Sequence, residues 1–313
     1  MDLRHLRYFV AVAEERHFTR AASSRRSALR IRNLEREMGT PLLRRLSRGV
    51  ELTESGALLL DEARRILDQV ERTKAGVLSR ARGETGRIKL GFAGATYFQP
   101  LVPAIIRAYR ERYPRVVLTP EQSNTPQLVA GLQRGEIDVA FVRPPAAHSD
   151  GLKIDLLIEE PMLIVLPATH PRARQRSLPL EALAEERFIL FPRAVGPGLH
   201  DAIIACCQRA GFSPRLGQEA PQIVSTVHMV AAGFGASLVP QSIQQIHAEG
   251  VAYIRIEGEA PRAPISLAYR SDDHSAAVRN FVALARRDKR SGAPGRASMR
   301  ATGSADGTAE AER

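Results

Sequence analysis

The feature that most constrains this chain is a long, uninterrupted helical pattern over residues 54–80. Apolar or small side chains recur there at intervals of 4, 3, 4, 3 and 4 residues, at Leu59, Ala63, Ile66, Val70, Thr73 and Val77. This spacing is a heptad seam, and an isolated helix of this length cannot bury such a stripe by itself. We therefore expect a partner helix from a second subunit, with packing on the chain's own domain as the alternative.

A small basic module precedes the long helix. Residues 3–15 and 25–38 each show an apolar helical stripe, and a second short helix is expected to begin near Arg20. Residues 42–52 predict two short strands around a turn, a wing. Residues 1–58 hold 12 Arg, no Lys and 7 acidic residues, a net formal charge of +5 in a chain of +11. The arginine guanidinium can donate two parallel hydrogen bonds to a phosphate or to the edge of a guanine. The arginine-rich composition therefore favours a nucleic-acid partner, although a solvated basic surface has the same composition.

From residue 87 onward, strands and helices alternate, which is typical of an α/β fold with a largely parallel sheet. The same pattern of a helix, a glycine that ends it and a buried strand occurs twice, over residues 128–142 and 228–240. This repeat predicts two Rossmann-like lobes, similar to those of periplasmic binding proteins, that face each other across a cleft. Residues 265–269 and a helix over 276–286 are expected to return to the first lobe.

The predicted domain organisation follows from these patterns. It comprises a head over 1–58, a linker helix and hinge over 59–86, an effector-binding domain over 87–290 and a disordered tail over 291–313. Within the effector-binding domain, lobe I is expected at about 87–161 and 266–290, and lobe II at about 162–265.

Several protein classes are disfavoured by the sequence. No run of 18 apolar residues predicts a membrane span, and the amino terminus does not resemble an export signal. Cys206 and Cys207 are adjacent, hence poor disulfide partners, which is consistent with a cytoplasmic location. The eight His residues are scattered, with no zinc-like spacing and no Gly-x-Ser-x-Gly motif, so we expect no metal, no cofactor and no enzymatic activity.

A specific set of residues in the first sixty positions carries a family motif. Its members are Phe18, Thr19, Ala21, Ala22, Ile31, Leu34, Glu35, Gly39, Arg48, Leu52, Thr53 and Gly56. In these positions the chain resembles the LysR-type transcriptional regulators, over roughly residues 1–290. The resemblance implies a winged helix-turn-helix whose third helix enters the major groove, a dimerising linker helix, and a two-lobed domain that holds a small effector.

The chain departs from the family pattern between Ala22 and Ile31. Family members usually have about five more residues here, which supply the rest of the second helix and the turn that sets its angle to the third. The alternative reading is therefore an effector-binding dimeric regulator with impaired DNA binding. A solute-binding protein and a peroxide sensor are further alternatives, disfavoured by the basic head and by the apolar surroundings of the two cysteines.

We assign DNA contacts to the beginning of the third helix and to the wing. The candidates on the helix are Arg25, Arg26, Ser27 and Arg30, and the phosphate-contacting candidates on the wing are Arg45 and Arg48.

Two loops predict an anion site. Residues 123–126 (Ser-Asn-Thr-Pro) begin a helix with Thr125 near its N-cap, and residues 94–96 follow the first strand. Helix amino termini at the carboxyl ends of parallel strands bind anions, so we expect a carboxylate effector. Resemblance to regulators of aromatic-compound degradation implies that it is aromatic or muconate-like. The residues implied are Thr96 and Thr125 on the carboxylate, Arg143 in a secondary pocket, and Pro197, Gly198 and Leu199 on the opposite lobe.

The sequence therefore predicts a LysR-type DNA-binding transcriptional regulator controlled by a small organic acid. The expected partners are double-stranded promoter DNA, the effector, and copies of the chain in a homodimer or homotetramer, with RNA polymerase as a further candidate and no membrane.

Overall fold

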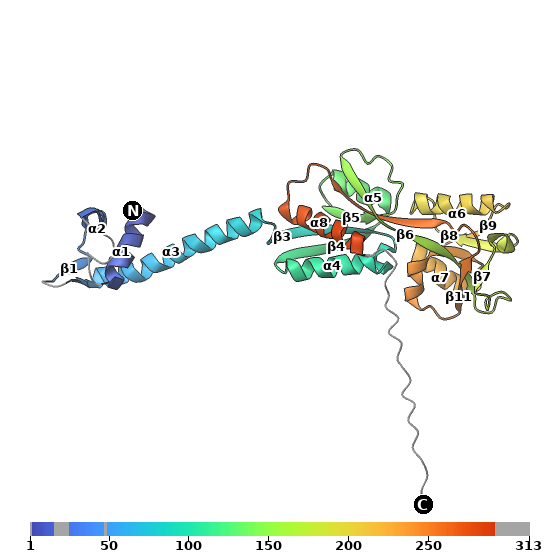
Figure 1. Cartoon of the computed structure of the whole chain (residues 1–313), viewed down its shortest axis with the longest axis horizontal. Helices are drawn as coiled ribbons and strands as arrows, with labels where there is room; N and C mark the ends of the chain where they lie inside the picture. Colours follow the sequence, from blue (N-terminus) through green and yellow to red (C-terminus); the bar gives the residue numbers. More distant parts are fainter. Residues whose placement is uncertain (1, 16–24, 47–48, 292–313) are drawn as a thin grey trace, which may run out of the picture. The chain divides into compact units, whose positions relative to one another are not determined.

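The computed structural model describes residues 2–15, 25–46 and 49–291 and separates into two compact units, Met1–Arg82 and Gly83–Arg313 (Figure 1). The elements of the first unit are α1 (Leu3–Glu15), α2 (Arg25–Met38), β1 (Leu43–Arg45), β2 (Val50–Leu52) and α3 (Glu54–Ala81). The two predicted helices, the wing and the long helix are confirmed. The helix expected near Arg20 and the tail predicted beyond Ser291 lie outside the described residues. No described helix is long and apolar enough to cross a membrane.

The first unit has its own hydrophobic core, to which α1, α2, the wing and the start of α3 contribute. Its buried side chains include Leu6, Phe9, Ile31, Leu34, Leu42, Val50, Leu59 and Ala63. The expectation that the whole α3 seam faces another subunit is therefore wrong for its first half, because Leu59 and Ala63 pack within this core. Farther along α3, Thr73 and Val77 are exposed.

Three motif residues join α2, the wing and α3. The Glu35 carboxylate accepts hydrogen bonds from the backbone amides of Leu42 (2.9 Å) and Leu43 (3.2 Å). Thr53 caps α3 by accepting from the Gly56 amide at 3.0 Å, and it donates to the Pro41 carbonyl at 2.8 Å. A Cβ on Gly56 would lie 2.0 Å from the Leu42 carbonyl oxygen, so only glycine permits this close approach.

The second unit is built on an eight-stranded mixed sheet with the order β4-β3-β5-β12-β6-β11-β7, in which β10 also pairs with β6. Lobe I contains β3 (Gly86–Ala93), a 3-10 turn (Thr96–Phe98), α4 (Leu101–Arg112), β4 (Val116–Ser123), α5 (Thr125–Gln133), β5 (Val139–Val142) and α8 (Ala276–Ser291). Lobe II contains β7 (Ser177–Leu178), a 3-10 turn (Leu180–Leu183), β8 (Arg187–Leu190), α6 (Pro197–Arg209), β9 (Arg215–Glu219), α7 (Ile223–Ala231), β10 (Ser237–Pro240), a 3-10 turn (Gln241–Ile246) and β11 (Val251–Ile256).

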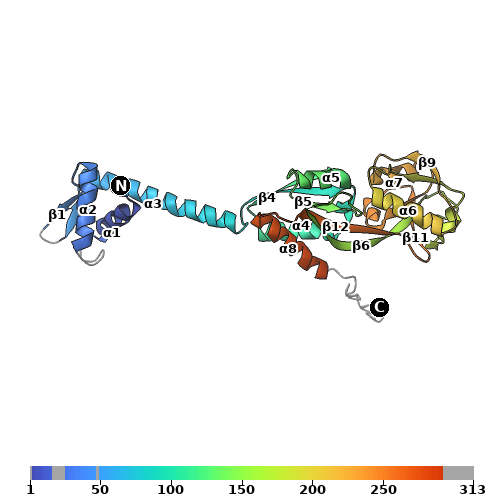
Figure 2. The same ribbon diagram turned by 90° about the horizontal axis from the view of Figure 1, so that it is seen from above.

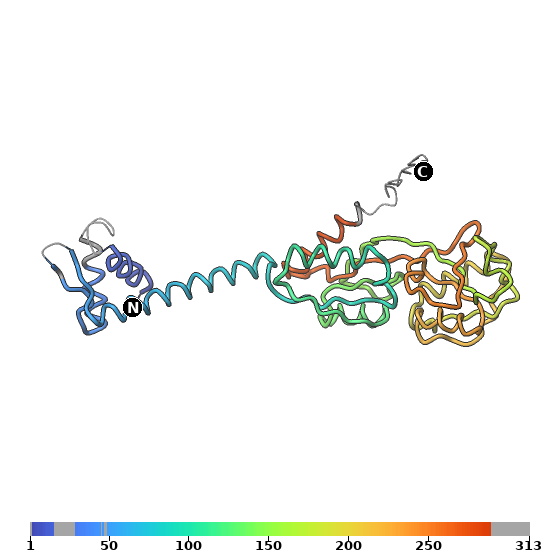
Figure 3. The backbone as a smooth tube through the Cα atoms, turned by 90° about the horizontal axis from the view of Figure 1, so that it is seen from below, coloured from blue at the N-terminus to red at the C-terminus, as the bar shows by residue number. Residues whose placement is uncertain are grey.

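Two long strands, β6 (Leu152–Pro167) and β12 (Arg262–Arg270), pass between the lobes (Figures 2 and 3). They pair antiparallel from Arg262↔Pro161 to Arg270↔Leu152, with an irregularity between Ile265 and Ser266. In lobe I, β3 pairs parallel with β4 and β5, whereas β12 runs antiparallel to β5. The sheet is therefore less parallel than the sequence indicated, because both crossing strands run against their neighbours.

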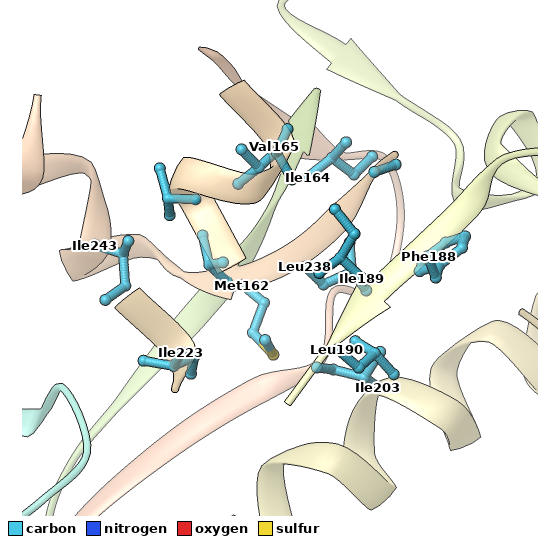
Figure 4. Packing of buried hydrophobic residues seen from close by; sticks show 14 of the residues in the cluster. Met162, Ile164, Val165, Phe188, Ile189, Leu190, Ile203, Ile223, Leu238 and Ile243 are labelled. Carbon is cyan, nitrogen blue, oxygen red and sulfur yellow. The ribbon is translucent and has the colours of Figure 1, made fainter. Parts of the chain in front are cut away.

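Each lobe has a separate core. In lobe I, the Tyr109 hydroxyl is buried and donates to the Ala277 carbonyl at 3.0 Å, which ties α4 to the start of α8. In lobe II, β6, β8 and the helices enclose a hydrophobic cluster that includes Met162, Ile164, Val165, Phe188, Ile189, Leu190, Ile203, Ile223, Leu238 and Ile243 (Figure 4). The two cores place the ends of β3, β4 and β8 at the same edge of the unit.

Gly56→Ala is expected to destabilise the first unit by about 1–3 kcal/mol, because its methyl group overlaps the Leu42 carbonyl. Gly76→Ala on the same helix is the matched control. A Cβ at Gly76 meets no atom within 4 Å, so alanine there should stabilise α3 by up to about 1 kcal/mol. Urea denaturation followed by circular dichroism measures both effects. Equal stability of the two variants would contradict the proposed close approach.

Candidate functional site

A cavity of about 410 Å³ lies at the edge where strands of lobe I end and helices of both lobes begin. This volume is within the range of small-molecule sites, roughly 300–1,000 Å³. Its lining residues are Ala93, Gly94, Ala95, Gln122, Ser123, Asn124, Thr125, Gln127, Arg143, Phe191, Val195, Gly196, Leu199, Pro221, Gln222, Ile223 and Val224. None of these described residues is acidic, and Arg143 is the single cation among them.

Three helices, α5, α6 and α7, begin at the cavity. Asn124 caps α5, since its side-chain oxygen accepts from the Gln127 amide at 2.8 Å, and Thr125 is the first residue of the helix rather than its cap. The N-cap residues of α6 and α7, Gly196 and Gln222, form no side-chain capping bond. The partial positive charge of each helix start is thus directed at the same small volume, which favours an anion there.

Thr125 and Arg143 are held together through the backbone. The buried Thr125 hydroxyl accepts from the Arg143 amide at 3.2 Å and lies 3.4 Å from the Arg143 carbonyl oxygen, to which it can donate. This contact fixes the start of α5 against the segment that follows β5, so two of the predicted effector residues lie side by side at the cavity.

Arg143 belongs to a buried polar network at the junction of the lobes. Its guanidinium forms an ion pair with Glu160 of β6 at 3.1 Å, with both side chains less than a tenth exposed. The Glu160 carboxylate also accepts from the backbone amide of Ser242 in lobe II at 2.8 Å and from its hydroxyl at 3.1 Å. The Arg143 Nε is shielded from solvent and has no hydrogen-bond partner among the described residues.

Burial lowers the pKa of the Arg143 guanidinium from its ordinary value, and Glu160 opposes this shift by favouring the charged form. An arginine remains protonated at neutral pH even so. Arg143 thus remains charged and is paired with Glu160, and its Nε is a buried donor without a partner among the described residues.

The other predicted effector residues occupy different surroundings. Leu199 lines the cavity, whereas Pro197 and Gly198 lie beside it at the start of α6. A Cβ on Gly198 would lie 2.3 Å from the Pro144 carbonyl oxygen, so the role of this glycine is to allow α6 to approach lobe I. Thr96 is fully buried behind the lining, and its hydroxyl has no partner among the described residues.

Sequence reasoning missed Glu160 and the apolar wall formed by Phe191 and Ile223. Adjacent carboxylates are usually solvated, yet successive strand residues face opposite sides, so Glu159 is exposed and Glu160 is buried. Nothing in the sequence distinguishes Phe191 and Ile223 from the other apolar residues of lobe II. Which of the core residues border the cavity depends on the packing of lobe II.

The predicted DNA contacts lie in the first unit. The Arg30 guanidinium stacks over the Tyr8 ring of α1, 4.2 Å from its centroid. Arg25, Arg26 and Ser27 lie in the first turn of α2 and Arg45 lies in β1, but their side chains are outside the described set, as is the whole of Arg48. Arg44 of β1 forms an ion pair with Glu51 across the hairpin at 3.3 Å.

The two cysteines lie buried on α6. Burial raises the pKa of the Cys207 thiol to about 12 and also raises that of Cys206, so both thiols remain protonated near neutral pH. This disfavours the peroxide-sensing alternative, since the thiolate is the reactive form. Among the described residues, no group of three His, Cys, Asp or Glu side chains could hold a metal ion.

Two family models match the chain. Residues 3–57 match the bacterial regulatory helix-turn-helix protein of the lysR family, and residues 81–290 match the LysR substrate binding domain. The chain belongs to the LysR family of transcriptional regulators. This confirms the resemblance in the head motif and the prediction of a DNA-binding transcriptional regulator with an effector-binding domain, not an enzyme.

Several relatives are similar over their full length. The HTH-type transcriptional regulator BudR of Raoultella terrigena is 37% identical over 289 residues, covering 91% of this chain and 100% of BudR. The regulator AlsR of Bacillus subtilis is 33% identical over 287 residues, covering 90% and 94% of the two chains. The crystal structure of CbnR, a LysR-family regulator, matches with a TM-score of 0.82 and 28% identity over 91% of this chain and 100% of CbnR. Full-length CbnR complexed with its target DNA matches with a TM-score of 0.81 and 28% identity, covering 92% and 100%.

Glu160→Gln is expected to lower the free energy of unfolding by about 3–5 kcal/mol, because it leaves the Arg143 charge buried without its partner. Glu159→Gln is the matched control one position away on the exposed side, and it should change stability by less than about 0.5 kcal/mol. Urea denaturation of the full chain compares the two. A small effect of Glu160→Gln would show that the buried ion pair contributes little.

Proposed function

We propose that this LysR-family regulator controls its promoters in response to a small carboxylate effector bound in the cavity between lobes I and II. One observation carries this proposal: three helix amino termini and the buried Arg143 converge on a cavity with no acidic residue among its described lining. A carboxylate placed there accepts from the backbone amides at the helix starts and, by replacing the Arg143 carbonyl as acceptor, from the Thr125 hydroxyl.

The cavity wall favours an unsaturated or aromatic carbon skeleton. Phe191, Leu199 and Ile223 supply apolar side chains to the lining of the same cavity. An aromatic or muconate-like acid places its carboxylate at the helix starts and its carbon skeleton against these side chains. Such a division between a few polar anchors and an apolar wall is usual in small-molecule sites.

Thr125→Val is expected to raise the dissociation constant of benzoate or cis,cis-muconate about tenfold, because it removes a hydroxyl that can donate to the carboxylate. Thr119→Val, at an exposed position on β4 of the same lobe, is the control and should leave the constant unchanged. Isothermal titration calorimetry of the full chain measures both. An unaltered constant in Thr125→Val would remove Thr125 from the site.

The head is proposed to act on promoter DNA in pairs. Val70, Thr73 and Val77 continue the α3 seam beyond the part used by the head's own core, and Val77 is 66% exposed. A partner helix from a second copy would cover this stripe, giving a homodimer or a homotetramer. In this arrangement residues 1–58 form the DNA-binding head, 59–86 the linker, and 87–290 the effector-binding domain with its lobes divided near 161 and 265.

Arg25→Ala combined with Arg30→Ala is expected to abolish the shift of operator DNA in a gel titration while leaving the oligomeric mass unchanged in light scattering. Arg25 lies in the first turn of α2, where phosphates or base edges would be contacted, and Arg30, which stacks on Tyr8, adds positive charge to the same part of the head. Arg115→Ala combined with Arg134→Ala removes the same charge from the second unit, where both arginines pair with glutamates, and serves as the control.

The alternative of impaired DNA binding rests on the short segment between Ala22 and Ile31. It predicts a different outcome of the same titration. The unmodified chain would then form the oligomer and bind the effector, but would show no salt-sensitive affinity for duplex DNA.

A further inference from the structure

Leu29 is an exposed apolar side chain on α2. The other leucine and the isoleucine of this helix, Leu34 and Ile31, are buried in the head's core at 0% and 2% exposure, whereas Leu29 is 57% exposed. A single exposed leucine is ordinary on a protein surface. This one is distinctive because of the residues that share its face of the helix.

Leu29, Arg32 and Arg36 stand at i, i+3 and i+7, so they form one stripe along α2 on the side away from Ile31 and Leu34. Both arginines are exposed. The neighbouring Glu35 is turned toward the wing, where it binds the Leu42 and Leu43 amides, and does not neutralise the stripe. The described part of this face is therefore a cationic strip with one apolar side chain at its amino-terminal end.

Arg30 does not share this face, because its guanidinium lies over the Tyr8 ring of α1. A cation–π contact of this kind is worth about 0.5–1 kcal/mol at an exposed site, enough to favour the stacked arrangement. Leu29 is thus the described side chain near the start of α2 that can contact another molecule on this face of the helix.

We infer that Leu29 contacts the C5-methyl group of a thymine in the major groove, with Arg32 and Arg36 on the flanking phosphates. The inference rests on the proposed use of α2 as the helix that enters the groove. Among the four standard bases, thymine alone presents a methyl group at the major-groove edge, and apolar side chains read it. The contact removes both the methyl group and the leucine from water, while the arginines supply charge complementarity to the backbone.

The test uses the full chain and duplexes that it retains from a randomised DNA library. Each thymine of a retained site is replaced by uracil, which lacks only the methyl group, and the dissociation constant is measured by gel shift at fixed salt. At one thymine position in each half-site, uracil should weaken binding of the unmodified chain about fourfold, the equivalent of one buried methyl group. The same replacement should have no effect on Leu29→Ala.

Leu58→Ala is the matched control, because Leu58 is an exposed leucine of the same unit, on α3. It should keep the uracil sensitivity of the unmodified chain. Uracil sensitivity that persists in Leu29→Ala, or that is absent at every position in the unmodified chain, overturns the inference. A changed oligomeric mass of Leu29→Ala with an unchanged uracil profile also overturns it, because Leu29 would then contact protein.

Failure of the underlying proposal gives a separate signature. Arg32→Ala and Arg36→Ala should each weaken binding to all retained duplexes alike and reduce the dependence of affinity on salt. If neither variant alters affinity or salt dependence, α2 does not face the DNA. If no duplex is retained at all, the chain does not bind duplex DNA. The proposed DNA-binding function of the head and the inferred Leu29–thymine contact are then both overturned.

Discussion

The antiparallel pairing of β6 with β12 is the constraint on which the effector-binding unit depends. Both strands pass between the lobes, but β12 pairs with β5 in lobe I, whereas β6 also carries β10 and β11 of lobe II. The Arg143–Glu160 ion pair lies at this crossing, and Ser242 of lobe II binds the same carboxylate. Arg143 also lines the cavity, so the proposed effector site and the strand that joins the lobes share one buried network.

The head depends on a different set of local contacts. Glu35, Thr53 and Gly56 are family motif residues that make contacts within the head. They connect the end of α2 to the wing and to the start of α3 through backbone hydrogen bonds and one close approach. The presence of these three residues in the family motif is therefore explained by their role in holding α2, the wing and α3 in fixed relative positions. Leu29 lies on the outer face of α2 and takes no part in this framework.

The helices of the head, the wing and the linker were predictable because periodicity and capping are encoded by residues close together in the chain. Thr53 at the N-cap and the apolar stripe of α3 are examples. The meeting of residues 94–96 with Thr125 was also predictable, since carboxyl ends of parallel strands meet at one edge, whereas Arg143 was expected in a secondary pocket and lines the same cavity. Glu160 was not, because its partners Arg143 and Ser242 are 17 and 82 residues away in sequence. The antiparallel crossing of β6 escaped prediction for the same reason.

The sequence by itself determined the family, the order of the elements and the basic character of the head, because these follow from local pattern, motif and charge. Only the tertiary structure decided which half of the α3 seam the head uses, which helix starts share a cavity, and that Arg30 turns to Tyr8 while Leu29 stays exposed. Each of these outcomes depends on contacts between segments distant in the chain. Residue type and spacing along the chain are compatible with several environments for one side chain. Burial and packing against distant segments decide which of these environments it occupies.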